Sequence, residues 1–190
     1  MVMEAWRRRS PESAPATHGR GDQIRYRIVQ FARQIAPRRM GPLDAVLRSE
    51  LQPAEWELVA RLTAGDRAHL FDTWRRLNEA GCHDPDVLKA ALLHDIGKVD
   101  DRGRVYLAHR VLVVLLRRFA PRVLERLAGN GAPGWRYGFY LAIEHPRAGA
   151  ELARLAGSSP RVCWLIAHHQ DHGASGDEGL ALLQSADEEG

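Results

Sequence analysis

Cysteine is scarce in this chain of 190 residues, and its two cysteines, Cys82 and Cys163, lie far apart. Such a pair argues against a disulfide framework and against a cysteine-rich zinc site. Long hydrophobic stretches are also missing, since no unbroken apolar run exceeds six residues, and the run at residues 111–116 is followed by Arg117. A membrane-spanning helix needs about 20 apolar residues, so the sequence predicts none. We expect the run 111–116 to lie in the core instead.

The N-terminus lacks the apolar stretch of a secretory signal, although it carries three consecutive arginines at residues 7–9. We therefore expect a cytoplasmic protein that does not engage a membrane. The formal net charge is +3, and the first 39 residues hold nine arginines against three acidic residues. Residues 1–22 are rich in Arg, Pro, Ser and Gly, which predicts a flexible leader. A basic leader could contact nucleic acid, but we favour a solvated extension and expect no nucleic-acid partner.

Alternation between apolar and polar residues, the mark of a half-buried strand, is absent over any useful length. Apolar residues instead recur at helical spacing, and the length suits one domain. We therefore predict a single all-α domain over residues 23–190. The first expected helix covers residues 24–37, and the next three begin at Pro42, Pro53 and Thr63. A further helix runs from Asp84 to a turn at 100–103, and four more cover residues 106–119, 121–128, 135–144 and 146–155. The last two run from Pro160 through His169 and from Asp177 onward, and residues 129–134 form the clearest loop.

A histidine and an aspartate interrupt the apolar stretch of residues 90–98, as His94 and Asp95. Burying such groups without partners costs on the order of 1–3 kcal/mol each, so they must be paired, hydrogen-bonded or metal-bound. Adjacent residues on a helix point about 100° apart, so both side chains can converge on something at the helix flank. Lys98, one turn after His94, adds a cation on the same face.

Metal-binding residue types recur along the chain at intervals of about one helix or helix pair. The features are His69, His94 with Asp95, His145, His168 with His169, and Asp187. Imidazoles and carboxylates together suit iron, manganese, zinc or magnesium. Such a cluster could hold two ions bridged by a carboxylate, an arrangement that polarises a phosphoryl oxygen and generates hydroxide at neutral pH.

The order of His69, His94-Asp95 within His-Asp-Ile-Gly-Lys, and Asp187 resembles the H…HD…D signature of the HD-domain superfamily of metal-dependent phosphohydrolases. The resemblance extends over about residues 60–188. Residues 144–152 resemble the superfamily's H-P-x-x-G-A segment, and residues 166–170 resemble its I-x-x-H-H segment. The Gly-Tyr-Pro element of the cyclic-di-GMP phosphodiesterase branch is absent after the His-His pair. The resemblance implies an HD-like helical bundle with a metal site between its central helices.

This resemblance also implies roles for the residues. The first ion would be held by His69, His94, Asp95 and Asp187, and Asp95 would bridge to a second ion held by His145 and by His168, His169 or both. We favour His169 of that pair. Asp95 and Lys98 would be the catalytic residues, with Lys98 contacting the substrate phosphate. Arg110 is a further candidate for a substrate contact, and His109 is either another or a residue of the helix surface.

These implications define the expected function. The chain would be a phosphomonoesterase or phosphodiesterase that needs divalent ions, two of them, drawn from iron, manganese, zinc or magnesium. A metal-activated hydroxide would attack a small phosphorylated molecule, either a nucleotide or a compound derived from one. The alternative is a non-catalytic, metal-stabilised module that binds a ligand or takes part in signalling.

Overall fold

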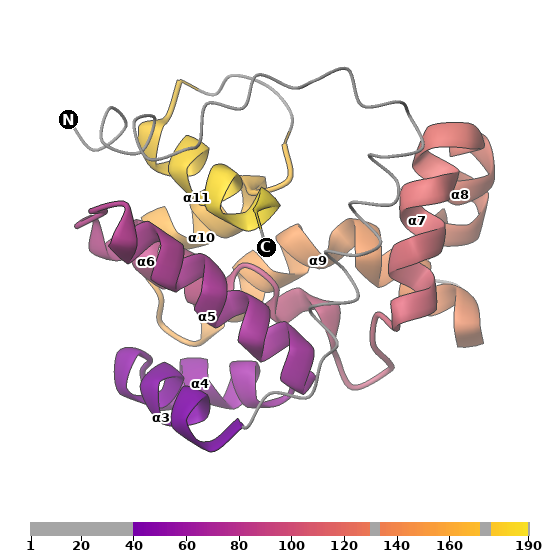
Figure 1. Cartoon of the computed structure of the whole chain (residues 1–190). Coiled ribbons are helices and arrows are strands. Elements are labelled where there is room, and N and C mark those ends of the chain that lie inside the picture. Colours follow the sequence, from indigo (N-terminus) through magenta and orange to yellow (C-terminus); the bar gives the residue numbers. More distant parts are fainter. Residues whose placement is uncertain (1–39, 130–133, 172–175, 190) are drawn as a thin grey trace.

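The computed structural model describes residues 40–129, 134–171 and 176–189, and these residues are helical throughout apart from short connections (Figure 1). No strand occurs among them, and the nearest approach to one is an isolated bridge between Val99 and Arg104. The prediction of an all-α fold is therefore confirmed. The expected leader, the helix at 24–37 and most of the loop at 129–134 lie outside the described residues.

The helices follow one another with short connections. They are α3 (Met40–Glu50), α4 (Pro53–Ala60), α5 (Ala64–Glu79), α6 (Pro85–Leu93), α7 (Leu107–Phe119), α8 (Pro121–Ala128), α9 (Tyr137–Leu155), α10 (Pro160–His168) and α11 (Glu178–Glu188), with 3-10 turns at Ile96–Lys98 and Gly134–Arg136. Side-chain oxygens of Thr63, Asp84, Ser159 and Asp177 accept first-turn N–H groups of α5, α6, α10 and α11. These N-caps fix where each helix begins.

The main core lies between α5, α6, α10 and α11, where Leu70, Leu93, Leu165 and Leu183 are fully buried. Helix α9 packs along α10 and against the 3-10 turn after α6. A smaller cluster that includes Val113, Leu124 and Phe139 joins α7 and α8 to α9. Figure 1 shows α7 and α8 side by side at the edge of the molecule. None of the described helices is long and apolar enough to cross a bilayer.

The prediction that the run 111–116 belongs to the core was wrong. Val111, Leu112, Val114 and Leu115 are all exposed, and only Val113 of the run is buried. Helix α7 lies at the edge, where its main contacts among the described elements are with α8 and α9, so most of this apolar run does not pack against the described part of the chain.

The prediction that a new helix begins at Pro146 was also wrong, because Pro146 lies inside the single helix α9. Pro146 removes one backbone hydrogen bond from α9, but the helix remains continuous because it packs along α10 and against the 3-10 turn. The His-Asp pair, in turn, does not lie within a helix. Helix α6 ends at Leu93, His94 is its C-cap, and Asp95 precedes the 3-10 turn.

Candidate metal centre

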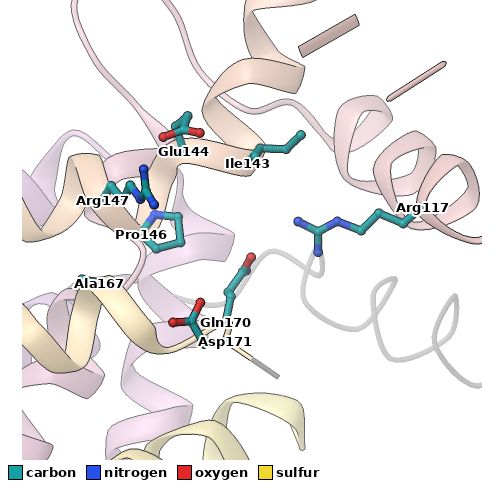
Figure 2. Close-up of a pocket in the computed structure, with 8 residues that line it drawn as sticks. All are labelled: Arg117, Ile143, Glu144, Pro146, Arg147, Ala167, Gln170 and Asp171. Atoms are coloured by element: carbon teal, nitrogen blue, oxygen red, sulfur yellow. The ribbon is translucent and has the colours of Figure 1, made fainter. Parts of the chain in front are cut away.

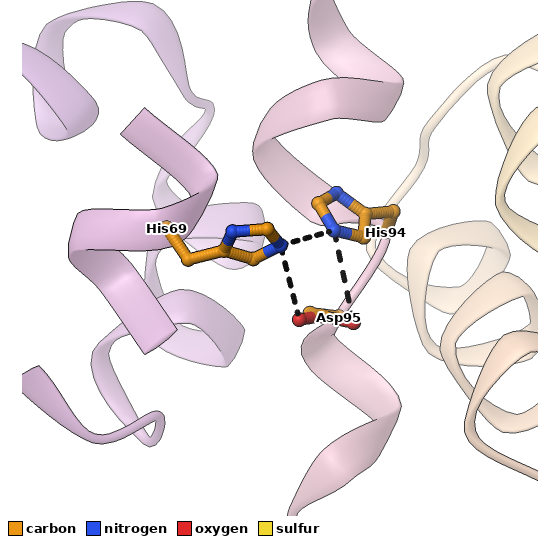
Figure 3. Close-up of side chains that lie close together, drawn as sticks. All are labelled: His69, His94 and Asp95. Atoms are coloured by element: carbon orange, nitrogen blue, oxygen red, sulfur yellow. Dashed lines mark hydrogen bonds and ion pairs between the residues drawn. The ribbon is translucent and has the colours of Figure 1, made fainter. Parts of the chain in front are cut away.

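Three side chains from three separate segments meet beside the end of α6. His69 comes from α5, His94 caps α6, and Asp187 comes from α11. The Nε2 atom of His69 lies 2.7 Å from the Asp187 carboxylate and 3.3 Å from Nε2 of His94. The Asp187 oxygen is also 3.3 Å from Nε2 of His94. Figure 3 shows His69 and His94 turned toward each other, with Asp95 close to both.

A second group forms on the other side of Asp95. His145 from α9 places Nε2 3.5 Å from one Asp95 oxygen, and His169, which caps α10, packs its ring against those of His94 and His145. The ligand atoms of Asp95, His145 and His169 lie within 4.8 Å of one another, as do those of His69, His94 and Asp95. Asp95 belongs to both groups, which is the placement that a bridging carboxylate needs.

Three of the histidines are oriented by the same backbone contact. The Nδ1 atoms of His94, His145 and His169 lie 3.0, 3.1 and 2.7 Å from the carbonyl oxygens of the residues three positions earlier. A carbonyl oxygen can only accept, so each Nδ1 carries the proton. Each Nε2 is then the nitrogen directed into the cluster, as in metal-binding histidines whose second nitrogen is held by a backbone carbonyl.

Those carbonyls can accept a bond from a ring because none of them has a helical N–H partner four residues later. Helices α6 and α10 end at Leu93 and His168, so their last carbonyls have no helical N–H partner. In the middle of α9 the same result comes from Pro146, because the N–H that would bond to Ala142 does not exist. The Ala142 carbonyl therefore accepts from the ring of His145.

Close backbone packing sets the position of α9 relative to Asp95. A Cβ atom on Gly97 would collide with the carbonyl of His145 and would lie 2.7 Å from the backbone nitrogen of Gly149. Glycine is therefore needed at residue 97, because a side chain there would push α9, and with it His145, away from the cluster.

Burial and nearby charges give His145, His169 and Asp95 the protonation states that metal ligands require. Burial lowers the pKa of His169 to about 4, and burial together with Lys98 lowers the pKa of His145 well below its usual range. Both rings are neutral at pH 7. Burial acts to raise the pKa of Asp95, but Lys98 and the surrounding histidines outweigh it and hold that pKa well below the usual range. Asp95 is therefore a carboxylate.

His94 behaves differently. Burial would lower its pKa, but the carboxylates of Asp95 and Asp187 reverse the effect and raise it. A cation beside these two carboxylates is thus favoured at the position of His94. A divalent ion there would take over that role and would release the proton.

The donor set fits divalent metal ions on two observations. The Nε2 atom of His169 is buried and has no hydrogen-bond partner, although an orphaned polar atom of this kind is costly. The Nε2 atoms of His69 and His94 lie 3.3 Å apart and both lie close to one Asp187 oxygen, so three potential ligand atoms from three segments converge there. Nitrogen and carboxylate donors suit iron, manganese or zinc, and no cysteine takes part.

The remaining predicted site residues have other surroundings. Lys98 contacts the Asp95 carboxylate directly. The ring of His168 stacks on Trp164 and bonds to that residue's carbonyl, so the structure does not bring it into the cluster. His109 is buried, and its two ring nitrogens bond to the backbone of Tyr106 and Trp135.

Arg110 reaches from α7 to α5, where it pairs with the buried carboxylate of Asp66. Asp66 lies three residues before His69 on α5, so the pair is close to the first ligand group in the sequence of that helix. Arg110 is therefore engaged by protein, and its contact holds α7 against α5.

A pocket of about 480 Å³ lies next to the second ligand group, and no sequence motif predicted it. Figure 2 shows the residues that line it: Arg117, Ile143, Glu144, Pro146, Arg147, Ala167, Gln170 and Asp171. The amide nitrogen of Gln170 lies 3.3 Å from Nε2 of His145, which connects the pocket to the cluster. In the sequence, only the position of Gln170 next to His169 indicates that this residue lies near the cluster.

The fold and the cluster define a class, an all-helical protein with two His/Asp groups able to bind metal at its centre. The sequence model of the HD domain matches residues 68–188, more than half of the chain. The chain therefore belongs to the HD-domain family and is a metal-dependent phosphohydrolase of that superfamily. Searches among curated proteins and among solved structures gave no match.

Proposed function

We propose that the protein hydrolyses a phosphate ester of a nucleotide or of a nucleotide-derived molecule, with two divalent ions bound by His69, His94, Asp95, His145, His169 and Asp187. The observation that carries the proposal is the sharing of Asp95 between two ligand groups, in which the rings of His94, His145 and His169 are oriented by backbone carbonyls. Ions at these positions would supply hydroxide at neutral pH and neutralise charge on the phosphoryl oxygens.

The residues of the chain divide the remaining work. Asp95 and Asp187 would offset the positive charge of bound ions, and His69, His94, His145 and His169 would supply nitrogen ligands to them. Lys98, which contacts Asp95 and is partly exposed, is placed to contact the phosphoryl group and to stabilise the negative charge that develops on it.

The reaction is a hydrolysis. The oxygen of water forms a bond to phosphorus, the bond from phosphorus to the leaving oxygen breaks, and a proton ends on that oxygen. Gln170 lies beside His145 at the edge of the cluster, where its amide can donate a hydrogen bond to the substrate.

Metal content and turnover test this proposal together. The purified protein should contain about two equivalents of iron, manganese or zinc by elemental analysis, and it should hydrolyse p-nitrophenyl phosphate or bis-p-nitrophenyl phosphate once loaded. A protein that binds metal through Asp95 yet hydrolyses no phosphoester would instead be a metal-stabilised binding module. A protein without metal, unchanged by His94→Ala, would contradict both readings.

A further inference from the structure

The pocket beside His145 contains two guanidinium groups without a partner among the described residues. Arg117 enters from α7 and Arg147 from α9, and both are exposed. No hydrogen bond or ion pair joins either side chain to another group among the residues that the structure describes. Arg110, two turns before Arg117 on α7, instead pairs with Asp66. Two arginines from separate helices at one pocket are well suited to bind phosphate, because each guanidinium can donate two hydrogen bonds to it.

The location ties these arginines to the reaction. Pro146 lines the pocket and directly follows His145, while Gln170 lines it and contacts the ring of His145. A ligand in the pocket would therefore lie next to the second ligand group. The cleaved phosphate would be neutralised by the ions, so Arg117 and Arg147 remain available for a different anionic group.

Two carboxylates restrict what that ligand can be. Glu144 and Asp171 line the same pocket, so its charged side chains balance formally. A purely anionic ligand such as inorganic polyphosphate would be repelled by the carboxylates. A nucleotide offers both kinds of group, because its phosphates suit the arginines while its sugar hydroxyls and base amino groups can donate to carboxylates. The volume of about 480 Å³ lies within the range of ordinary small-molecule sites.

We infer that this pocket binds the leaving part of the substrate, and that Arg117 and Arg147 hold a second phosphate that is not the one cleaved. The substrate is then a nucleotide with at least two phosphate groups, rather than a nucleoside monophosphate. This inference rests on the proposed function for the position of the cleaved phosphate, and it assigns a specificity role to two residues outside the metal cluster.

Binding to the metal-loaded, full-length protein tests the inference directly by calorimetry. The probes are adenosine 5′-monophosphate and the methylene-linked analogue of adenosine 5′-diphosphate. The wild type should bind the diphosphate analogue at least about tenfold more tightly, since one charge-assisted contact accounts for roughly that factor. Arg117→Ala and Arg147→Ala should each reduce this preference by about tenfold, and Arg117→Lys should retain part of it.

The matched control is Arg118→Ala. Arg118 is the next residue on α7, is equally exposed and lies over the ring of Phe119 rather than in the pocket. This variant should keep the preference of the wild type. Equal binding of both probes by the wild type, or an equal loss in Arg118→Ala, would overturn the inference. Inorganic pyrophosphate that binds as tightly as the diphosphate analogue would overturn the assignment to a nucleotide.

Hydrolysis of p-nitrophenyl phosphate, run in parallel, separates this inference from the proposed function. A preference for the diphosphate analogue that depends on Arg117, in a protein without hydrolytic activity, would support the subsite and contradict the proposed function. Hydrolysis without any such preference would support the proposed function and contradict the subsite.

Discussion

Two buried polar clusters in this molecule differ in one respect that separates structure from function. Glu55 on α4 is almost fully buried, and its carboxylate accepts hydrogen bonds from Lys89, from the backbone of Gln52 and from Ser158, each at 2.8–2.9 Å. Every acceptor has a donor, and Lys89 also bonds to the carbonyl of Glu50. This cluster is complete without any added group, and it ties α4 to α6 and to the start of α10.

The cluster around Asp95 is incomplete by the same criterion. The Nε2 atom of His169 is buried and has no hydrogen-bond partner among the described residues. The other buried nitrogens without a partner among the described residues, Nε of Arg110 and Nε of Arg136, are guanidinium donors that cannot bind a metal ion, so the buried lone pair without a partner lies beside Asp95. The difference teaches that unsatisfied buried donors and acceptors, rather than buried polarity itself, mark the site where an ion belongs.

The largest effect should come from Asp95→Asn, which removes charge from the residue that both ligand groups share. We expect metal content to fall below one equivalent and phosphoester hydrolysis to fall by at least about 10³-fold, because the ions lose their common ligand. Elemental analysis and steady-state rates measure this. Full metal retention with normal turnover would show that the two groups do not share a bridging carboxylate.

The next largest effect should distinguish His169 from its neighbour. His169→Ala removes a neutral ligand from the second group, and we expect its affinity for the second ion to fall by about 100-fold. His168→Ala removes a ring that stacks on Trp164 and should leave metal affinity within about twofold. Titration of the metal-free variants with manganese measures both. The reverse ranking would place His168 in the centre.

Glu55→Gln should affect stability and leave the metal alone. The variant leaves Lys89 without its carboxylate, and we expect the free energy of unfolding to fall by about 2 kcal/mol, with a drop in Tm of roughly 6 °C. Thermal denaturation measures this, and metal content should stay at the wild-type value. A loss of metal in this variant would mean that the two clusters are coupled.

Pro146→Ala should lower the affinity for metal and raise the stability of the metal-free protein. The new N–H at residue 146 can bond to the Ala142 carbonyl, which then competes with the ring of His145. We expect metal affinity to fall by about tenfold and the metal-free protein to become more stable, because an interior proline disfavours a helix. Metal titration and denaturation of the metal-free form measure the two effects. Unchanged affinity would show that Ala142 does not orient the ring.

The smallest effect is the pH dependence of the Glu55 contribution. Burial acts to raise the pKa of Glu55, but Lys89, Gln52 and Ser158 outweigh it and lower the pKa. The unfolded state therefore binds the proton first, and the stabilisation is present above about pH 4.5 and is lost as the pH falls through the folded-state pKa. The stability difference between wild type and Glu55→Gln should shrink in acid, as measured by urea denaturation.

The sequence predicted most of the helices because caps and helical periodicity are local. Thr63, Asp84, Ser159 and Asp177 lie where helices begin, and each accepts the backbone N–H groups expected of it. The predicted ligands also came from residue type and resemblance, and the structure brings six of the seven together. Their assignment as ligands stays a prediction until metal binding is measured.

Other features depend on which elements approach one another, and local pattern does not contain that information. Residues 111–116 have the composition of a core segment, but α7 lies at the edge, so most of the run is exposed. Pro146 has the local character of a helix start, yet packing continues α9 through it. The pocket joins Arg117 to Gln170 across two helices, which no spacing along the chain reveals.

The proline within α9 also suggests a rule for protein engineering. A histidine in the middle of a regular helix finds nearby carbonyls that already accept a backbone N–H, so a bond from its ring must share the acceptor, as the ring of His168 does at Trp164. A proline placed directly after it releases one carbonyl at the right distance, as Ala142 is released for His145. A histidine-proline pair is therefore a portable two-residue unit that would install a ligand of fixed orientation on a long helix without a supporting side chain.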